Sequence, residues 1–337
     1  MNIVYSSSDA YAECTGVSLW SLYEKNKHIK ELNVYILDTD ISDINLRRLQ
    51  EVADYFGRPI VFIKASDGFA KGARELNLPL LRGSYNTYSR VIMNTWFDTL
   101  DKVFVIDSDT LVTGDIEPIW NIDIADKLIG AVPEVAMYGK YNSLEDPDII
   151  RNVPMYYNMG MCLINLREWR KRNIDAVLRE RITADNPKLM IADQSIINKY
   201  LNNDIERLLL KYNYYSVVHD VDLSTLRKVF PKKDVFNEYE YNDARCNPSI
   251  IHYFGHSFER PWFKHNAAYM RKEYLTIRNR TPWKNDPLRA WQRADSRIIQ
   301  IYDIITYLLM LMGARKFALK FRYVYGQRIK MITGVHR

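Results

Sequence analysis

The sequence lacks the signals of several common protein classes. Only three cysteines occur among its 337 residues, at positions 14, 162 and 246, and no two of them have C-x-x-C spacing. This argues against a disulfide framework and a structural zinc site, and it favours a reducing, cytoplasmic setting. The sequence has neither a G-x-x-x-x-G-K-[ST] phosphate loop nor a G-x-G-x-x-G fingerprint, so ATP hydrolysis and dinucleotide binding of that type lose their main support. We therefore expect any phosphate chemistry to depend on a bound metal ion.

Clear membrane signals are also absent. Residues 1–6 lack the basic start and long apolar stretch of a secretory signal, so we interpret them as a first strand. Residues 298–312 are strongly apolar, but they include Gln300 and Asp303 and fall short of the ~20 residues needed to span a bilayer. We expect an interfacial helix there. The alternative is a helix that packs on the rest of the protein and keeps a charged face in solvent.

The positive charge is concentrated in the C-terminal part of the chain. The net charge is +6, yet residues 260–337 contain 17 basic and only 4 acidic residues, so the remainder is net acidic. Basic and aromatic residues are interleaved near the end: Arg315, Lys316, Phe317, Lys320, Phe321, Arg322, Tyr323, Tyr325, Arg328 and Lys330. Such a segment suits an anionic membrane surface better than nucleic acid. We expect no nucleic-acid partner, and a cytoplasmic protein that can lie on the inner face of the cytoplasmic membrane.

The first part of the chain alternates strand and helix patterns. Short apolar runs at residues 3–6, 33–37 and 60–63 are separated by helical periodicity at residues 11–24 and 42–56. This alternation predicts an α/β fold with a mostly parallel central sheet.

Two later apolar runs, at residues 102–106 and 160–166, predict further buried strands, and a helix-like stretch at residues 88–97 precedes the first of them. The length fits one α/β domain with an appended region. We place that domain at residues 1–265 and a basic, helical C-terminal region at residues 266–337.

Two carboxylates follow the buried run at residues 102–106. Asp107 and Asp109 are two residues apart, so in an extended chain both can face one divalent cation. Open α/β sheets bind ligands beyond the carboxyl ends of their strands, which supports a functional interpretation. Alone, a D-x-D pair is more often a turn or a helix cap.

The string at residues 106–111 also resembles the aspartyl nucleophile motif of haloacid dehalogenase-type phosphatases. There the first Asp, here Asp107, would attack phosphorus with the help of magnesium. Against this, the motif stands far from the start of the chain, and no convincing downstream Lys and paired-Asp signature follows a matching strand. The phosphatase is the competing enzyme class.

Other polar residues stand at predicted element boundaries. His252 ends an apolar run, where its imidazole could join two carboxylates on a metal, although a lone His is more often structural. Asn158 could hold sugar hydroxyls and Gly160 would allow close backbone approach, or the pair could form a tight turn. Asp193 opens a predicted helix, where it could be an N-cap, a sugar contact or both.

Taken together, these segments resemble glycosyltransferase family 8, a retaining group that includes bacterial lipopolysaccharide galactosyl- and glucosyltransferases and glycogenin. The resemblance covers about the first 265 residues. Its motifs follow in order at residues 3–11, 88–90, 100–109, 114–116, 157–160, 163–170, 193–195 and 252–255. The ordered combination is far more specific than any single motif.

The resemblance implies a GT-A fold with one nucleotide-sugar-binding domain and a UDP-galactose or UDP-glucose donor. It implies that Asp107, Asp109 and His252 bind Mn²⁺, with Mg²⁺ as the alternative, and that the ion holds the donor diphosphate. Around the nucleotide, it implies uridine contacts from Ser6, Asp9 and Tyr11 and a ribose contact from Ser108. It implies contacts to the donor sugar from Arg90, Asn158, Gly160, Asp193 and Gln194. It also implies contacts to the diphosphate from Gly255 and a following basic residue.

The chain departs from the family pattern at two places. Ser8 and Ala10 stand beside Asp9 where relatives often carry an acidic residue and an Asn, so the base preference is inferred. The stretch after Gly255 is two residues longer than usual and carries Arg260 in place of the family's Lys. Arg260 could clasp a phosphate bidentately, but Arg and Lys are not equivalent. The alternatives for this contact are His256 and Lys264.

We expect retaining transfer of a hexose to a glycan or lipid-linked acceptor. Negative charge on the leaving phosphate would be stabilised by the metal and Arg260. Gln194 is a poor nucleophile, so we favour attack by the acceptor hydroxyl on the same face of the sugar. In this mechanism Gln194 would position and stabilise the reacting sugar, and Asp193 would bind its hydroxyls. A transient adduct on Asp193 is the alternative. A catalytically inactive glycan-binding protein is a further alternative.

Overall fold

A computed structural model describes residues 1–80, 85–139, 145–185, 191–232, 235–291 and 297–326 of the chain. The strands are β1 (Asn2–Ser7), β2 (Asn33–Asp38), β3 (Ile60–Lys64), β4 (Lys102–Ile106), β5 (Thr110–Val112), β6 (Ile129–Pro133), β7 (Tyr157–Asn165), β8 (Ile205–Arg207), β9 (Tyr214–Tyr215) and β10 (Ile250–His252). The helices are α1 (Ala12–Lys25), α2 (Asp43–Tyr55), α3 (Ser66–Glu75), α4 (Glu117–Trp120), α5 (Pro147–Asn152), α6 (Leu166–Lys171), α7 (Ile174–Asp185), α8 (Ala192–Tyr200), α9 (Leu223–Val229), α10 (Glu238–Cys246), α11 (Arg271–Arg278), α12 (Arg297–Leu311) and α13 (Arg315–Lys320).

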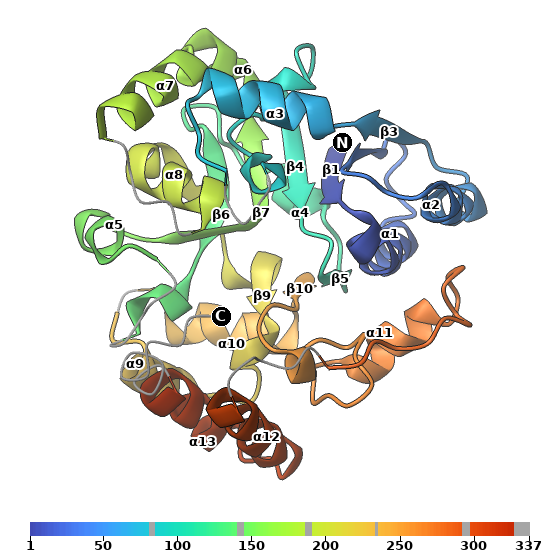
Figure 1. Cartoon of the computed structure of the whole chain (residues 1–337), viewed down its shortest axis with the longest axis vertical. Coiled ribbons are helices and arrows are strands. Elements are labelled where there is room, and N and C mark those ends of the chain that lie inside the picture. Colours follow the sequence, from blue (N-terminus) through green and yellow to red (C-terminus); the bar gives the residue numbers. More distant parts are fainter. Residues whose placement is uncertain (81–84, 140–144, 186–190, 233–234, 292–296, 327–337) are drawn as a thin grey trace.

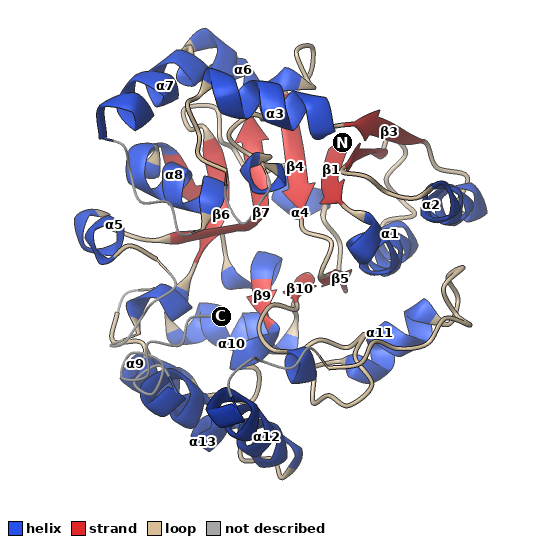
Figure 2. Ribbon diagram, in the orientation of Figure 1, coloured by secondary structure: helices blue, strands red, loops and turns tan. Residues whose placement is uncertain are grey.

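The central sheet has seven strands in the order β3-β2-β1-β4-β7-β6-β8 (Figure 2). Strand β7 runs antiparallel to both of its neighbours, and the other neighbouring pairs are parallel. The predicted mostly parallel α/β sheet is therefore confirmed. Parallel strands need helical crossovers, which accounts for the helices on both faces of the sheet (Figure 1).

Alternate residues of the strands belong to two hydrophobic cores. On β1, Ile3 and Tyr5 pack in the core that includes α1 and α2, whereas Val4 packs in the core that includes α3 and α8. On β4, Phe104 joins the first core and Val105 the second. Burial on both faces explains why these strands are almost continuously apolar in the sequence.

A second, three-stranded sheet has the order β5-β10-β9. Strand β10 pairs antiparallel with β5, which places His252 opposite Thr110, and it pairs parallel with β9. Because β5 begins directly after Asp109, this pairing brings a histidine from late in the chain to the carboxyl end of β4.

The predicted helix at residues 88–97 is wrong. Two short 3-10 turns, Asn86–Tyr88 and Met93–Thr95, lie there instead. Between them, the backbone N–H of Arg90 donates to Asp193 Oδ2 at 3.1 Å rather than to a helical carbonyl. A tertiary contact has replaced the local hydrogen bond that a helix would need.

The C-terminal part of the described chain packs against the rest of the protein. Arg278 of α11 forms an ion pair with Glu13 of α1, with Nε 2.5 Å from Oε1. Helix α12 buries one side, including Tyr302 and Thr306, and exposes the other. Among the described residues, no helix combines the length and the hydrophobicity that crossing a bilayer would require. The boundary between residues 265 and 266 stays a prediction.

Candidate active site

Two carboxylates and an imidazole converge beyond the carboxyl end of β4. His252 Nε2 lies 3.3 Å from Asp109 Oδ1 and 3.7 Å from Asp107 Oδ2. One ligand atom from each of the three residues lies within 4.8 Å of the others. Two carboxylates and one imidazole suit Mn²⁺, and also Mg²⁺ where water completes the coordination. The structure thus brings together the three metal ligands that the sequence predicted.

The electrostatics of this trio reflect burial and mutual attraction. Burial raises the pKa of Asp107, although Arg90 opposes that rise. Burial also acts on Asp109, but the adjacent His252 outweighs it and holds the pKa of Asp109 below its usual value. Burial alone would lower the pKa of His252, yet the two carboxylates raise it. The excess negative charge of the trio favours a cation between the side chains.

Gly160 of β7 makes room for this arrangement. A Cβ atom at this position would lie 2.3 Å from Cε1 of His252, so no larger residue fits without displacing the ring. The carbonyl of Gly160 accepts a hydrogen bond from the backbone N–H of Asp107 at 2.8 Å. Gly160 is therefore in contact with two of the three candidate ligands.

Arg90 links the metal ligands to Asp193. Its guanidinium forms an ion pair with Asp107 and a second one with Asp193, where Nη1 lies 3.2 Å from Oδ2. Arg90 and Asp193 are both buried, and burial raises the pKa of Asp193 even though Arg90 opposes the shift. The N-cap of α8 is Ile191, so the prediction that Asp193 could be an N-cap is wrong. Its carboxylate turns towards Arg90 instead.

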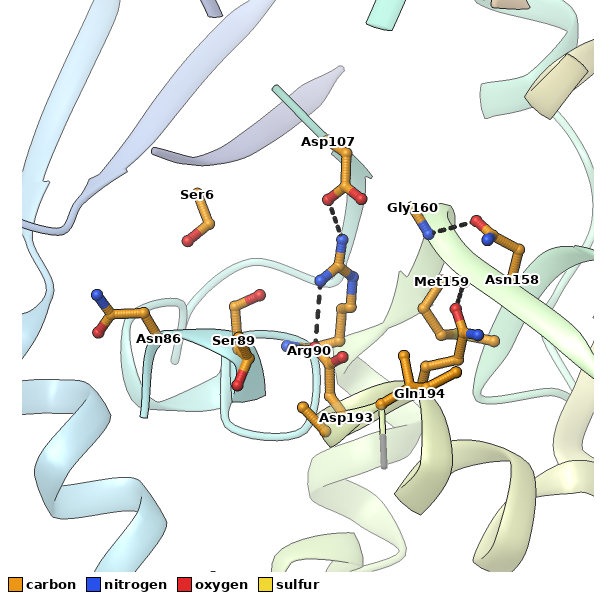
Figure 3. Close-up of a pocket in the computed structure, with 13 residues that line it drawn as sticks. Ser6, Asn86, Ser89, Arg90, Asp107, Asn158, Met159, Gly160, Asp193 and Gln194 are labelled. Carbon is orange, nitrogen blue, oxygen red and sulfur yellow. Dashed lines mark hydrogen bonds and ion pairs between the residues drawn. The ribbon is translucent and has the colours of Figure 1, made fainter. Parts of the chain in front are cut away.

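A cavity of about 480 Å³ opens beside these residues (Figure 3). Its lining contains seven predicted residues: Ser6, Arg90, Asp107, Asn158, Gly160, Asp193 and Gln194. The amide of Gln194 accepts from the backbone N–H of Met159 at 3.0 Å and donates to the hydroxyl of Tyr156 at 3.4 Å. The lining also contains Asn86 and Thr87, which no sequence signal had indicated, and Ser89, which belongs to the family motif at residues 88–90.

Of the three predicted uridine residues, Ser6 lines the cavity, whereas Asp9 and Tyr11 lie outside its lining. Ser108 Oγ donates to the carbonyl of Ser6 at 3.2 Å, which joins the ends of β1 and β4. Asp9 is exposed, and hydrogen bonds from Ser42 and Asn45 lower its pKa. Tyr11 is half-buried beside it. One carboxylate oxygen of Asp9, Oδ1, therefore already accepts two hydrogen bonds inside the protein.

Another cavity, of about 350 Å³, is lined by Asp9 together with residues from distant parts of the chain. Trp283 and Arg289 reach it from the segment after α11, and Arg48 reaches it from α2. Nothing in the sequence indicated these residues, because their nearness to Asp9 arises only from packing of the C-terminal part on α1 and α2.

Among the three basic candidates for a diphosphate contact, the geometry favours Arg260. Its charge acts on both Asp109 and Tyr11, and its Nε is buried without a hydrogen-bond partner in the described part of the chain. His256 instead forms an ion pair with Asp303 of α12, with Nδ1 2.9 Å from Oδ1, and Lys264 is exposed.

The loop that carries these residues is held by the C-terminal helices. Gly255 has φ +115°, and a Cβ there would lie 2.4 Å from Glu259 Oε2. Glu259 in turn forms an ion pair with Arg322, which directly follows α13 and Phe321. Together with the pair between His256 and Asp303, this contact ties the loop at residues 255–260 to α12 and the chain beyond it.

Asn213 is a further residue that the sequence did not indicate. Its Oδ1 lies 3.0 Å from Nδ1 of His252, and its amide nitrogen donates to Asn158 Oδ1 at 2.8 Å. Asn158, predicted as a sugar contact, also donates to Glu134 Oε2 at 2.9 Å. The side chain of Asn158 is thus largely committed to contacts within the protein.

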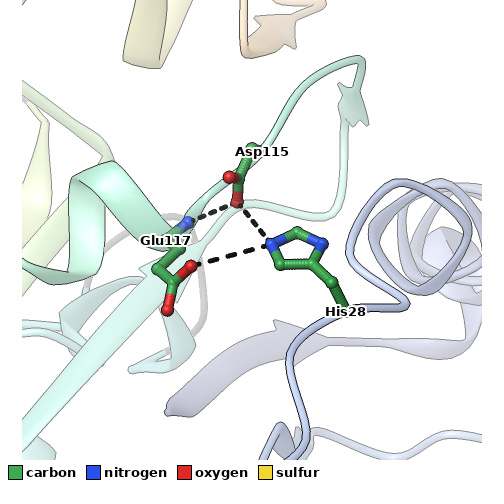
Figure 4. A group of neighbouring side chains, drawn as sticks. All are labelled: His28, Asp115 and Glu117. Carbon is green, nitrogen blue, oxygen red and sulfur yellow. Dashed lines mark hydrogen bonds and ion pairs between the residues drawn. The ribbon is translucent and has the colours of Figure 1, made fainter.

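A second group of one histidine and two carboxylates lies elsewhere (Figure 4). His28 Nε2 lies 3.3 Å from Asp115 Oδ1 and 3.8 Å from Glu117 Oε2. These side chains are 50%, 45% and 50% exposed, respectively. Exposed groups of this kind commonly form without binding an ion, so we do not assign a function to it.

Comparison with known proteins gives consistent matches. The profile of the family described as "Glycosyl transferase family 8" matches residues 2–266. General stress protein A of Bacillus subtilis is 26% identical over 84% of this chain and 94% of its own length. Lipopolysaccharide 1,3-galactosyltransferase of Salmonella typhimurium is 24% identical over 84% of this chain and 79% of its own length.

Solved structures resemble most of the chain. The galactosyltransferase LgtC, in complex with donor and acceptor sugar analogs, gives a TM-score of 0.63 at 22% identity and covers 84% of this chain and 99% of its own. The WbbM bifunctional glycosyltransferase gives 0.69 at 21% identity, over 84% of this chain and 50% of its own. These likenesses confirm the predicted GT-A fold.

Proposed function

This chain belongs to glycosyl transferase family 8, and from that premise we propose that it transfers galactose or glucose from a UDP-sugar to a glycan or lipid-linked acceptor, with retention and with dependence on Mn²⁺. The observation that carries the proposal is the convergence of Asp107, Asp109 and His252 beside the cavity that contains Arg90, Asp193 and Gln194. Named relatives include a lipopolysaccharide galactosyltransferase and glucosyltransferases, which motivates the two sugars.

The proposed metal ion would be held by Asp107, Asp109 and His252, and when bound it neutralises charge on the leaving diphosphate. Arg260 supplies a second positive charge on the same side, because its guanidinium lies near Asp109 and its Nε has no partner within the described residues. When Asp107 binds the metal ion, Arg90 would have to give up its contact with Asp107. It would keep its contact with Asp193.

On the sugar side, Asp193 and Gln194 have different capacities. Asp193 is ion-paired with Arg90, and its remaining carboxylate oxygen can accept from a sugar hydroxyl. The amide oxygen of Gln194 already accepts from Met159, so this residue is suited to hold a position rather than to form a bond with the sugar. We therefore retain same-face attack by the acceptor hydroxyl, with a transient adduct on Asp193 as the alternative.

The decisive experiment measures UDP release from a panel of UDP-sugars with and without Mn²⁺. We expect one hexose donor to give Mn²⁺-dependent turnover that Asp109→Asn abolishes. Asp115→Asn, which changes a carboxylate in the exposed histidine group, serves as the matched control and should retain full turnover. Absence of both turnover and binding for every UDP-sugar would contradict the proposal, and hydrolysis of phosphomonoesters would then favour the phosphatase.

A peripheral membrane location is a second part of the proposal. Helix α12 exposes an apolar stripe at helical spacing, and aromatic residues continue it: Ile298, Ile301, Ile304, Ile305, Leu308, Leu311, Met312, Phe317 and Tyr325 are each at least 40% exposed. Exposed apolar stripes of this length suit the boundary between lipid headgroups and acyl chains. The stripe supports an interfacial role for residues 297–326 on an anionic membrane.

The charges of this region contribute less than the sequence indicated. Arg315 pairs with Asp220, Lys316 with Asp222, and Arg322 with Glu259. Arg328 and Lys330 lie outside the described residues. Lys320 is exposed beside the stripe. We therefore expect apolar contact to dominate over electrostatic attraction.

Vesicle flotation tests the membrane proposal. The double substitution Ile301→Ser with Leu308→Ser should abolish flotation with vesicles that contain phosphatidylglycerol, whereas Tyr239→Ser, which alters an apolar residue exposed at 83% elsewhere, should not. Equal flotation of the three proteins would contradict it. Point substitutions are preferable to truncation, because α12 also supports the loop at residues 255–260.

A further inference from the structure

A buried line of hydrogen bonds runs from the backbone of β7 to the imidazole of His252. Asn158 Oδ1 accepts from the backbone N–H of Gly160 at 2.8 Å and from Asn213 Nδ2 at 2.8 Å. Asn213 Oδ1 then lies 3.0 Å from Nδ1 of His252. At the other end, Asn158 Nδ2 donates to Glu134, whose second carboxylate oxygen accepts from the N–H of Ala136 at 3.0 Å.

The direction of every bond in this line follows from one fixed donor. A backbone N–H can only donate, so the atom of Asn158 that faces Gly160 is its oxygen. That oxygen also faces the amide of Asn213, so the facing atom of Asn213 is its nitrogen. The oxygen of Asn213 is then the atom that faces His252, and an oxygen there requires a proton on Nδ1.

This protonation leaves the other ring nitrogen free to bind a metal. Nε2 is the atom that points at Asp109 and Asp107, at 3.3 Å and 3.7 Å. Metal-binding histidines usually donate their second ring N–H to an oxygen that fixes the tautomer and the ring orientation. Here the oxygen belongs to an amide, and Glu134 supplies a carboxylate two residues further along the line.

Burial and strand geometry make the line rigid. Asn213 is fully buried, and Asn158, Glu134 and His252 are at most 7% exposed, so bulk water does not compete for these bonds. Asn213 immediately precedes β9, whose Tyr215 pairs with His252. Asn213 itself ends the 3-10 turn Leu210–Asn213, and its contact with Nδ1 places its side chain directly against the imidazole.

We propose that Asn213 is a positioning residue of the metal site, which holds His252 in the Nδ1–H tautomer so that Nε2 presents its lone pair to the cation. The inference rests on the proposed function, since it assumes that the trio binds a divalent ion. Gly160 also connects this line of hydrogen bonds to a second proposed ligand. Its N–H donates to Asn158, which fixes the direction of the bonds, and its carbonyl accepts from the N–H of Asp107. One peptide segment thereby aligns ligands from β4 and β10.

Mn²⁺ binding to the full chain tests the role of Asn213 without any sugar or turnover. Electron paramagnetic resonance of free Mn²⁺ gives the dissociation constant for the wild type, Asn213→Ala and Asn198→Ala. Asn198 is the matched control, because it is equally buried and holds the backbone of Tyr157 in the same strand, but it is not bonded to His252. We expect Asn213→Ala to weaken Mn²⁺ binding by about 10–100-fold and Asn198→Ala by less than about 2-fold.

A spectrum of the wild type gives a second readout that does not depend on whether the variant folds. With Mg²⁺ bound, long-range ¹⁵N–¹H spectra of histidine-labelled protein should show His252 protonated at Nδ1. A bare Nδ1 would overturn the inference, as would equal Mn²⁺ affinity of the wild type and Asn213→Ala. Failure of the wild type to bind Mn²⁺ would instead overturn the proposed metal site and, with it, this inference.

Discussion

Within the described residues, two groups combine one histidine with two carboxylates, and they differ in what surrounds them. In the first, Asp107, Asp109 and His252 lie at strand ends, and the imidazole is held by a buried amide. In the second, His28 and its two acidic neighbours are about half exposed. The ligand types are the same, so residue composition does not separate the groups. Burial and support from neighbouring side chains do.

The largest expected effect concerns the buried charges of the first group. Arg90→Met should lower the free energy of unfolding by about 3–5 kcal/mol, because it leaves Asp107 and Asp193 without their common partner. Arg172→Met breaks a more exposed pair with Asp204 and should cost below about 1 kcal/mol. Urea unfolding measures both, and similar costs would show that burial does not distinguish these carboxylates.

Replacement of each histidine by alanine tests the comparison directly. His252→Ala should reduce Mn²⁺-dependent UDP release by about 100-fold or more, because one of three proposed ligands is removed. His28→Ala should leave UDP release unchanged within about 2-fold, because its ring is half exposed and does not line the cavity. Loss of turnover in both variants would contradict the distinction between the two groups.

The glycines beside the two groups give a smaller, steric test. Gly160→Ala should destabilise the protein by about 1–3 kcal/mol and weaken Mn²⁺ binding, since the new methyl would overlap the ring of His252. At Gly114, next to Asp115, a new Cβ would come no nearer than 3.2 Å to its closest neighbour, Cα of Ser249, so Gly114→Ala should cost below about 1 kcal/mol. Thermal unfolding measures the stability of the two variants, and Mn²⁺ titration measures their affinity for the ion.

The smallest effect concerns a further histidine and carboxylate pair, His219 with Asp220. Burial lowers the pKa of His219 to about 4, which is opposite to the shift at His252. Between the ordinary histidine pKa of about 6.5 and this value, the unfolded chain binds more protons, so stability should fall as the pH drops. His219→Phe keeps a ring against Tyr269 and should reduce the loss of stability between pH 7 and pH 5. If the stability of His219→Phe depended on pH in the same way as that of the wild type, the lowered pKa of His219 would be contradicted.

The sequence predicted those parts of the site that stand at strand ends. Asp107 and Asp109 follow a buried apolar run, and the end of such a run in an α/β sheet is where ligands bind. The same logic placed His252 correctly at the end of a strand. It did not show that β10 pairs with β5, because β-strand pairing between distant segments leaves no local pattern.

The remaining parts depend on contacts between distant segments. Asn213 carries no motif, and its role follows only from the pairing of β9 with β10. Residues 88–97 have helical periodicity, but the contact of Arg90 with Asp193 displaced the helix. The basic C-terminal segment was interpreted as a charged surface, although three of its cations form ion pairs with Asp220, Asp222 and Glu259. Tertiary contacts outweighed local preference in each case.

The ion pairs that hold the loop at residues 255–260 set a limit on how far this chain can be shortened. The family match ends at residue 266, which invites a cut there. Such a cut would remove Arg322 and Asp303, and Glu259 would keep a buried carboxylate without its cation. A shortened protein intended for crystallisation or screening should therefore extend at least to residue 326, even if the membrane-facing stripe on α12 has to be made polar to keep it soluble.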